Sequence, residues 1–217
     1  MKTGVEYKEL KDIEKRILKG IKIEDNLQNV KTVGAFDVGY SGKKYVCVAV
    51  VMDIESKKEL ETKYVTGDEV IPYSTSMVAF REGPAILDAY HSLDIKPDVL
   101  IVKGSGAIHS NKVSLASYVG ILTNKPCFGV SQDLLFGKLD EDKILFDNEL
   151  KGIAIKTKAF SNPIYIIPGH NISIESSVKL TKDLISEEYK MPLPIHLAHK
   201  LVNKLKKEFN IKIIQNN

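Results

Sequence analysis

Three strand-like segments follow one another closely in the first third of the chain, and this succession limits the possible folds most strongly. They span about residues 31–38, 44–53 and 58–66, and the turns between them are short enough for antiparallel hairpins. Helical and strand-like segments then alternate at about 82–90, 99–102, 113–122 and 126–130, which indicates parallel strands joined by helical crossovers. This order is typical of the ribonuclease H-like α/β fold, in which helices flank a mixed five-stranded central sheet.

The remaining segments extend the pattern at both ends. Apolar residues at helical spacing predict a helix over 5–19 and two more over 173–187 and 196–209. Segments 152–156 and 164–167 are predicted to form another extended pair. The chain has 217 residues, enough for one well-buried core, so we expect a single domain spanning 1–217.

Composition favours an intracellular protein. No apolar run approaches the roughly 20 residues that a membrane helix needs, and the lysine- and glutamate-rich start lacks the features of a secretory signal. We therefore expect a cytoplasmic protein that does not insert into a membrane. The net charge of +3 is too balanced to indicate a nucleic-acid partner by itself. Only Arg16 and Arg81 are arginines, and lysine suits contacts to phosphate better than recognition of bases.

In a fold of this order, the first strand, the fourth strand and the helix after the meander meet at one edge of the sheet. Three residues then come together: Asp37, Glu82 and Lys103. Asp37 follows a buried run, where a charge is unfavourable unless it is paired or metal-bound; an aspartate that caps a turn before Gly39 is the alternative. Glu82 is predicted at the start of its helix, where a carboxylate is favoured; an ordinary first-turn glutamate is the alternative.

Lys103 is the unusual member of this group. Carboxylate oxygens at such an edge can hold two Mg²⁺ ions about 3.5–4 Å apart for phosphodiester cleavage, and a lysine cannot coordinate them. We expect its ammonium group to take the position of a cation and to neutralise Asp37 and Glu82.

Three segments of the chain carry a family resemblance. They are Ala-Phe-Arg-Glu-Gly-Pro-Ala at 79–85, Gly-Ser-Gly-Ala-Ile-His at 104–109 and Gly-His-Asn-Ile-Ser-Ile-Glu at 169–175. In this order they resemble the signature segments of endonuclease V, over about residues 31–199. The resemblance implies a ribonuclease H-like fold and a nuclease that uses Mg²⁺, or Mn²⁺ in its place. Such a nuclease nicks DNA or RNA on the 3′ side of deaminated bases such as inosine.

The catalytic and metal-binding positions of the family correspond to five residues of this chain. Asp37 and Glu82 match two of the three metal carboxylates, and Lys103 replaces the third. His109 matches the histidine of the glycine-rich turn, and His199 matches a late histidine or aspartate near the metals. The resemblance therefore implies metal binding by Asp37 and Glu82, which Lys103 opposes.

A second set of positions corresponds to contacts with nucleic acid. Tyr73 matches the tyrosine of a strand-separating wedge and is predicted to stack on a base; a tyrosine packed on its own domain is the alternative. Gly104, Ser105 and Gly106 match a turn that helps to form the pocket for a flipped base; a tight strand-to-helix turn is the alternative. Gln132 stands where the family has a lysine, so two charge-bearing positions are altered together.

These observations lead to one principal hypothesis and two alternatives. We expect an endonuclease V-like enzyme whose cleavage of inosine-containing nucleic acid is reduced, because Lys103 opposes metal entry. The first alternative is a catalytically inactive relative that binds deaminated or distorted nucleic acid without cleaving it. The second is a structural protein that uses only the scaffold and shows neither binding nor nicking.

Overall fold

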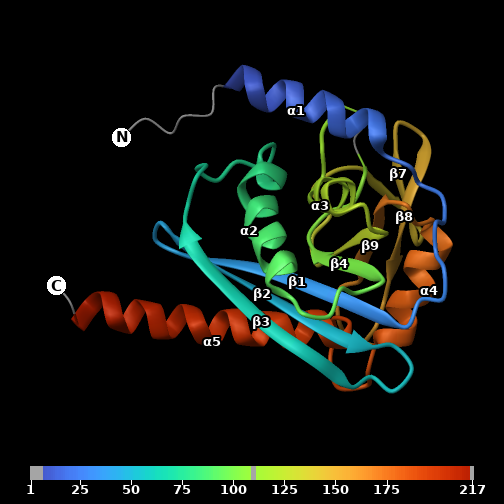
Figure 1. Ribbon diagram of the computed structural model, residues 1–217. Helices are drawn as coiled ribbons and strands as arrows, with labels where there is room; N and C mark the ends of the chain where they lie inside the picture. Colours follow the sequence, from blue (N-terminus) through green and yellow to red (C-terminus); the bar gives the residue numbers. More distant parts are fainter. Residues whose placement is uncertain (1–6, 109–110, 216–217) are drawn as a thin grey trace.

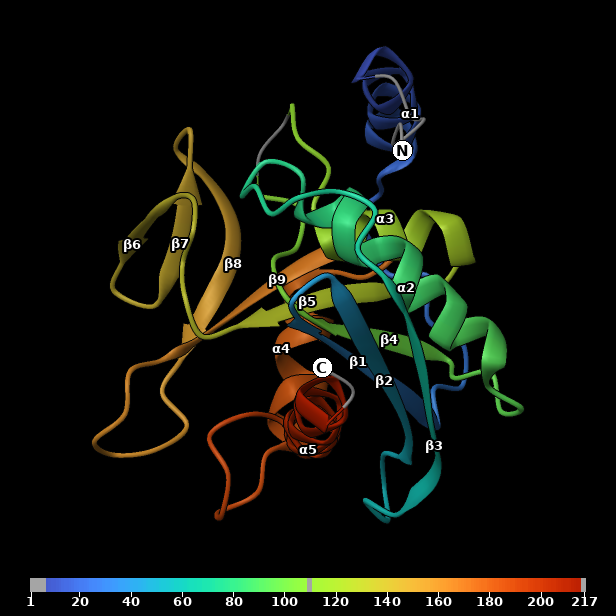
Figure 2. The same ribbon diagram turned by 90° about the vertical axis from the view of Figure 1, so that its left-hand side faces the viewer.

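A computed structural model describes residues 7–108 and 111–215, and the chain is built around one mixed β-sheet (Figure 1). Within these residues the sheet has nine strands in the order β3-β2-β1-β4-β5-β9-β8-β7-β6. Helices lie on both sides of the sheet, so the molecule has three layers (Figure 2). Both faces of the sheet are therefore covered by helices (Figure 2).

The first five strands have the predicted order. β1 (Thr32–Ser41), β2 (Lys44–Asp53) and β3 (Glu59–Asp68) form an antiparallel meander. β4 (Val99–Lys103) pairs in parallel with β1, and β5 (Cys127–Ser131) pairs in parallel with β4. The order β3-β2-β1-β4-β5 confirms the predicted ribonuclease H-like sheet. It also places β1 and β4 side by side.

The sheet continues beyond these five strands. β9 (Ile164–His170) pairs antiparallel with β5, and β8 (Glu149–Ile155) pairs antiparallel with β9, which confirms the predicted extended pair. β7 (Lys143–Phe146) and β6 (Lys138–Asp140) complete the edge. The sequence does not predict these two strands, because four and three residues are too few to show a clear alternation of apolar and polar side chains.

Five helices of the described residues cover the two faces of the sheet. α1 (Tyr7–Gly20), α2 (Val78–Ser92) and α3 (Leu115–Thr123) lie on one face, and α4 (Ile174–Leu184) and α5 (Leu193–Gln215) lie on the other (Figure 2). Separate clusters of buried apolar side chains fill the two sides. Within the described ranges, no helix combines the length and the apolar character needed to pass through a membrane.

Among the predicted boundaries that differ from the structure, the start of α2 changes the setting of Glu82. α2 begins at Val78 rather than at residue 82, because Ala79 and Phe80 are buried against the core and extend the helix toward its N-terminus. Glu82 therefore lies in the second turn of α2. The predicted stabilisation of its charge by the helix N-terminus does not apply, since that effect falls off within the first turn.

Candidate active site

The ends of β1 and β4 bring two of the predicted site residues together. Phe36 on β1 is paired with Val102 on β4, so Asp37 and Lys103 follow on adjacent strands. Lys103 is the last residue of β4, and its Nζ lies 3.4 Å from Oδ2 of Asp37. The predicted ion pair is therefore present with Asp37. Of the two carboxylates, Asp37 is the one within ion-pair distance of Lys103.

Asp37 is almost fully buried, with 4% of its surface exposed. Its Oδ2 also lies 2.7 Å from Nδ1 of His199. His199 belongs to α5, which lies on the face of the sheet opposite α2 (Figure 2). Nε2 of the same imidazole lies 3.0 Å from Nδ2 of Asn203, one helical turn further along α5. His199 thus joins the site through the same carboxylate oxygen that faces Lys103.

Nδ1 of His199 has two neighbours that compete for it. It lies 2.7 Å from Oδ2 of Asp37 and also 2.7 Å from Nζ of Lys103. A ring nitrogen either donates one hydrogen or accepts one. When Nδ1 carries a hydrogen it donates to Asp37, and when it carries a lone pair it accepts from Lys103. One tautomer therefore satisfies one neighbour only, and the two contacts are alternatives.

Glu82 comes from α2 and has an unusual pKa. Burial, followed by the negative charge of Asp37, raises the pKa of the Glu82 carboxyl to about 7. The positive charges of Arg81 and Lys103 act in the opposite direction. Glu82 is consequently only partly ionised near neutral pH. We refer to Asp37, Glu82, Lys103 and His199 as the charged cluster.

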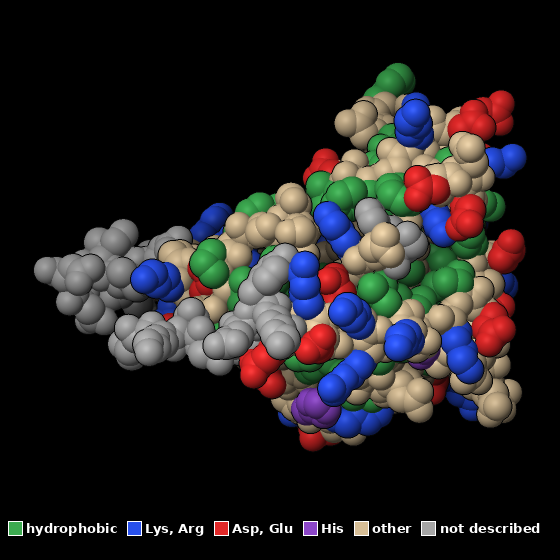
Figure 3. Space-filling view, turned by 90° about the horizontal axis from the view of Figure 1, so that it is seen from above, with side chains coloured by type: hydrophobic (Ala, Val, Ile, Leu, Met, Phe, Trp, Pro, Cys, Tyr) green, Lys and Arg blue, Asp and Glu red, His purple; other side chains and the backbone are tan. Residues whose placement is uncertain are grey.

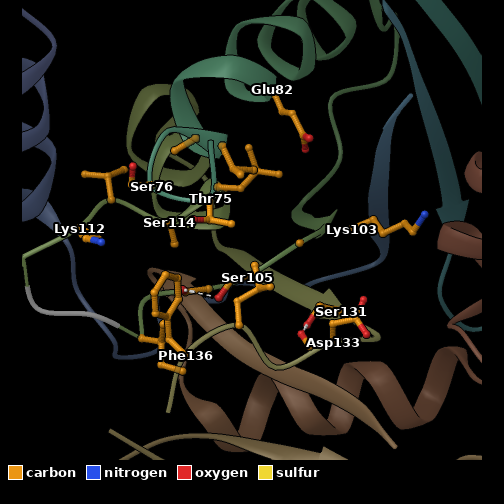
Figure 4. Close-up of a pocket in the computed structure, with 18 of the residues that line it drawn as sticks. Thr75, Ser76, Glu82, Lys103, Ser105, Lys112, Ser114, Ser131, Asp133 and Phe136 are labelled. Atoms are coloured by element: carbon orange, nitrogen blue, oxygen red, sulfur yellow. Dashed lines mark hydrogen bonds between the residues drawn. The ribbon is translucent and has the colours of Figure 1, made fainter. Parts of the chain in front are cut away.

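A pocket of about 420 Å³, which we call the base pocket, opens beside the charged cluster (Figure 4). Glu82 and Lys103 contribute to its lining. The residues predicted to contact nucleic acid all line it as well: Tyr73, Gly104, Ser105, Gly106 and Gln132. The structure thus brings the two predicted sets of residues together at one place. His109 lies outside the described residues, so its role stays a prediction.

The glycine-rich turn at 104–106 is held tightly against the sheet. The amide N of Gly104 donates to the carbonyl of Val130 at 3.1 Å, and the amide N of Ala107 donates to the carbonyl of Pro168 at 2.7 Å. A Cβ on Gly106 would overlap the backbone of Ile167, so the turn can come this close to β9 only with glycine at this position. The turn is therefore tight, as the alternative supposed, and it also lines the base pocket.

Part of the pocket lining is not predicted from the sequence. Phe136 follows β5 and lines the pocket, and Nζ of Lys112 lies 5.4 Å from its ring centroid. Ser114, the N-cap of α3, lines it too (Figure 4). The sequence does offer a signal for Phe136, because it is an aromatic residue only four positions after Gln132. Ser114 gives no such signal, because a serine before an apolar helix is an ordinary start.

Lysines lie beside the site without forming a purely positive surface. Lys200, Lys204 and Lys207 line a groove on α5 next to His199, together with Glu208. On the face shown in Figure 3, basic side chains are likewise interspersed with acidic and apolar ones. The electrostatic field is therefore mixed, and the base pocket is the more specific feature.

The described residues do not fit a two-cation centre. Asp37 and Glu82 supply carboxylate oxygens of the kind that Mg²⁺ prefers. The ammonium group of Lys103, however, lies 3.4 Å from Asp37. In the part of the chain that the structure describes, no group of three or more His, Cys, Asp or Glu is arranged to hold a metal ion. A divalent cation would enter this site against the like charge of Lys103.

The fold and the site together define a class of protein. A ribonuclease H-like sheet with acidic residues and a pocket at one edge of its strands is suited to act on nucleic acid. Comparison with known proteins gives the family, because the model of the Endonuclease V family matches residues 15–200. The chain belongs to the endonuclease V family, as its signature segments indicated.

Individual relatives match along most of their length. Endonuclease V of Dictyoglomus thermophilum is 34% identical over 214 residues, which cover 95% of this chain and 93% of the relative. Endonuclease V of Methanopyrus kandleri is 32% identical over 195 residues, which cover 86% of this chain and 83% of the relative. These identities extend the family match beyond the signature segments.

Solved structures confirm the fold. Endonuclease V of Bacillus subtilis has a TM-score of 0.87 at 24% identity, covering 98% of this chain and 97% of that chain. Endonuclease V of Ciona intestinalis, in complex with a 24mer DNA containing an inosine followed by a ribo-adenosine, has a TM-score of 0.81 at 24% identity. That match covers 93% of this chain and 98% of the Ciona chain.

Proposed function

We propose that this protein recognises inosine-containing DNA or RNA and nicks it on the 3′ side of the deaminated base at a strongly reduced rate. Family membership supports the endonuclease activity, which is hydrolysis of a phosphodiester bond. One observation carries the reduced rate: Nζ of Lys103 lies 3.4 Å from Oδ2 of Asp37, at the position where the resemblance implies a third metal carboxylate.

The base pocket supports the recognition step. Its volume of about 420 Å³ lies within the range of ordinary ligand pockets, and enzymes that act on damaged bases bind them in such pockets after flipping. Tyr73 lines the pocket and is 63% exposed, so its ring is accessible to a base. The Ciona intestinalis relative, which shares the fold, is in complex with inosine-containing DNA. We infer that the pocket receives the deaminated base.

The charged cluster supports a slow cleavage step. Lys103 neutralises Asp37 and repels a divalent cation, and the raised pKa leaves Glu82 partly protonated near pH 7. Both effects weaken the negative field that would attract Mg²⁺ or Mn²⁺. A loss of about 4 kcal/mol of transition-state stabilisation slows a reaction roughly 1000-fold. One misplaced charge is therefore enough to reduce the rate by orders of magnitude.

Binding without cleavage is the second candidate function. It is favoured by the finding that the described residues contain no group of three metal-ligating side chains. In this case the ammonium group of Lys103 takes the place of a cation beside the bound phosphodiester. Such a protein would bind inosine-containing nucleic acid equally well with and without divalent metal.

A nicking assay with three forms of the chain tests the proposal. The substrate is an oligonucleotide with one inosine, in Mg²⁺ or Mn²⁺, and the forms are the unchanged chain, Lys103→Asp, and Lys103→Asp combined with Gln132→Lys. We expect slow nicking by the unchanged chain and nicking about 1000-fold faster by the double variant, because a carboxylate then replaces the ammonium group. Asp37→Ala should abolish the activity of each form.

The possible results separate the two candidates. Equal rates for the unchanged chain and the substituted forms would contradict the role given to Lys103. Nicking by the substituted forms alone, with inosine-dependent binding by the unchanged chain in EDTA, would establish binding without cleavage. An oligonucleotide with guanosine in place of inosine controls for recognition in both assays.

A further inference from the structure

Tyr73 belongs to a stack of side chains that reaches back to the sheet. Cζ of Arg81 lies 3.7 Å from the ring centroid of Tyr40 and 5.4 Å from the ring centroid of Tyr73. The ring of Tyr40 lies in turn 6.3 Å from the ring of Tyr45, at the start of β2. These separations are those of cation–π and aromatic contacts. We call Tyr45, Tyr40, Arg81 and Tyr73 the arginine stack.

Two further contacts fix Arg81 in the stack. Its Nη2 lies 3.5 Å from Oε1 of Glu69, and the two side chains are only 10% and 18% exposed. The hydroxyl of Tyr40 donates to the backbone carbonyl of Arg81 at 3.2 Å. Glu69 is itself tied to the turn between β1 and β2, because its amide N donates to the carbonyl of Lys43. Arg81 is therefore held from several directions before any ligand binds.

The ring contacts, rather than hydrogen bonds alone, determine the orientation of the guanidinium group. Nε of Arg81 is buried and has no hydrogen-bond partner among the described residues. A buried N–H without an acceptor is unfavourable, so contacts with the flat face of the guanidinium must offset it. A lysine here would keep the charge that faces Glu69 but would lose the planar face.

We propose that Arg81 is a positioning residue that holds the ring of Tyr73 at the rim of the base pocket. Tyr73 lines the pocket and is 63% exposed, whereas the side chain of Arg81 is 10% exposed and is not part of the pocket lining. Arg81 thus acts through Tyr73. Holding the ring in place before a base arrives reduces the ordering that binding requires. This inference rests on the proposed function, since it takes Tyr73 as the residue that stacks on nucleic acid.

A fluorescence measurement tests the contact without any nucleic acid. The chain contains no tryptophan, so Tyr73→Trp introduces a single reporter at the pocket rim. Arg81→Lys in this background keeps the positive charge and removes the planar face. Arg16→Lys is the matched control, because Arg16 is the only other arginine and lies exposed on α1. Anisotropy and iodide quenching of the tryptophan are compared among the three forms, with circular dichroism to confirm folding.

We expect Arg81→Lys to lower the anisotropy and to increase iodide quenching, whereas Arg16→Lys leaves both unchanged. Unchanged anisotropy and quenching in folded Arg81→Lys would overturn the proposal. If Arg81→Lys does not fold, Tyr40→Leu provides the same test, because it removes the ring that lies 3.7 Å from Cζ of Arg81 and orients the guanidinium group. An immobile tryptophan in folded Tyr40→Leu would then overturn the proposal.

A binding cycle tests whether the positioning reaches the ligand. The ratio of affinities for inosine-containing and guanosine-containing oligonucleotides is measured for the unchanged chain, Arg81→Lys, Tyr73→Ala and the double variant. We expect Arg81→Lys to lower the ratio about five-fold when Tyr73 is present and to have no further effect in Tyr73→Ala. An equal loss in both backgrounds would overturn the proposal. If the unchanged chain shows no inosine preference, the proposed function fails, and the fluorescence result still decides the role of Arg81.

Discussion

The base pocket and the charged cluster share Glu82 and Lys103, yet the chain builds them in different ways. The wall of the pocket depends on close backbone packing, since Gly106 lies against β9 and a side chain on Gly129 would meet the turn at 104–106. The cluster depends on charges at the tips of side chains, where Asp37 and Lys103 compete for Nδ1 of His199. A substitution at Lys103 therefore alters the cluster without requiring any backbone of the pocket to move.

This difference indicates how recognition and cleavage can separate within one fold. Packing at Gly106 tolerates almost no change, because a single added methyl group meets backbone atoms of β9. The charge at the end of β4 can change sign while the strand keeps its pairing with β1 and β5. A member of the family can thus keep a base pocket after its metal ligands have been altered.

The largest expected effect comes from adding one methyl group to the pocket wall. Gly106→Ala should lower the free energy of unfolding by about 3 kcal/mol, because its Cβ would overlap the backbone of Ile167 and the turn must move away from β9. Urea denaturation followed by circular dichroism measures this change. Binding of the inosine oligonucleotide should be lost together with the stability.

Gly104→Ala is the matched control in the same turn. Its Cβ would lie 3.0 Å from the terminal Cδ2 of Leu115, a flexible side-chain end that can move. We therefore expect a loss of about 1 kcal/mol or less. A loss for Gly106→Ala as small as that for Gly104→Ala would show that the pocket wall tolerates an added methyl group, and the contrast between the two regions would fail.

A smaller effect is expected from the protonation of Glu82. Burial and the charge of Asp37 raise its pKa from 4.5 to about 7, so between these values the folded chain binds more protons than the unfolded chain. Stability should therefore fall as the pH rises through this window. Since the carboxyl is partly exposed, we expect a fall of about 2 kcal/mol, less than the full shift would give.

Glu82→Gln isolates this contribution because glutamine does not titrate. Urea denaturation from pH 5 to pH 8 should show the variant gaining stability relative to the unchanged chain as the pH rises. Glu187→Gln, which alters an exposed carboxylate, should follow the unchanged chain at every pH. Parallel curves for Glu82→Gln and the unchanged chain would mean that the cluster does not hold Glu82 in a raised-pKa setting.

The long strands could be predicted from the sequence, whereas the short ones could not. β2 shows seven consecutive buried residues, and such an apolar run is visible in the sequence. β7 depends on pairing with β8, and β6 depends on pairing with β7, so both strands are stabilised by neighbouring strands rather than by a pattern of their own. The predicted start of α2 at residue 82 is too late, because Ala79 and Phe80 join the helix through their burial against the core.

The grouping of Asp37, Glu82 and Lys103 could be predicted from the sequence, and so could the ion pair between Asp37 and Lys103, but the contacts of His199 and Arg81 could not. Element order alone places Asp37 beside Lys103, and the family resemblance adds His199. That Nδ1 of His199 is shared between the other two depends on the position of α5 across the sheet, which the sequence does not define. The sequence does not predict the contacts of Arg81 for the same reason, because Tyr40 on β1 and Glu69 after β3 reach α2 only through the packing of the fold.

The smallest expected effect tests whether the strand that carries the base passes Gln132. This exposed residue lines the base pocket, so Gln132→Lys adds a cation where a phosphate would pass. We expect inosine-oligonucleotide affinity to rise about three-fold at low salt, a change below about 1 kcal/mol. Its dependence on salt should steepen by a slope of about 0.7, the value for one phosphate contact on a single strand.

Gln28→Lys is the control for added charge alone. Gln28 is exposed and precedes β1, so it lies near the opposite end of the strands from the glycine-rich turn after β4. Fluorescence anisotropy of the labelled oligonucleotide gives the affinity from about 50 to about 200 mM NaCl, a range in which each phosphate contact changes the affinity measurably. The slope for each variant follows from these affinities. A steeper slope for Gln132→Lys alone would trace the strand past the base pocket, whereas equal slopes would mean that added charge acts without regard to the pocket.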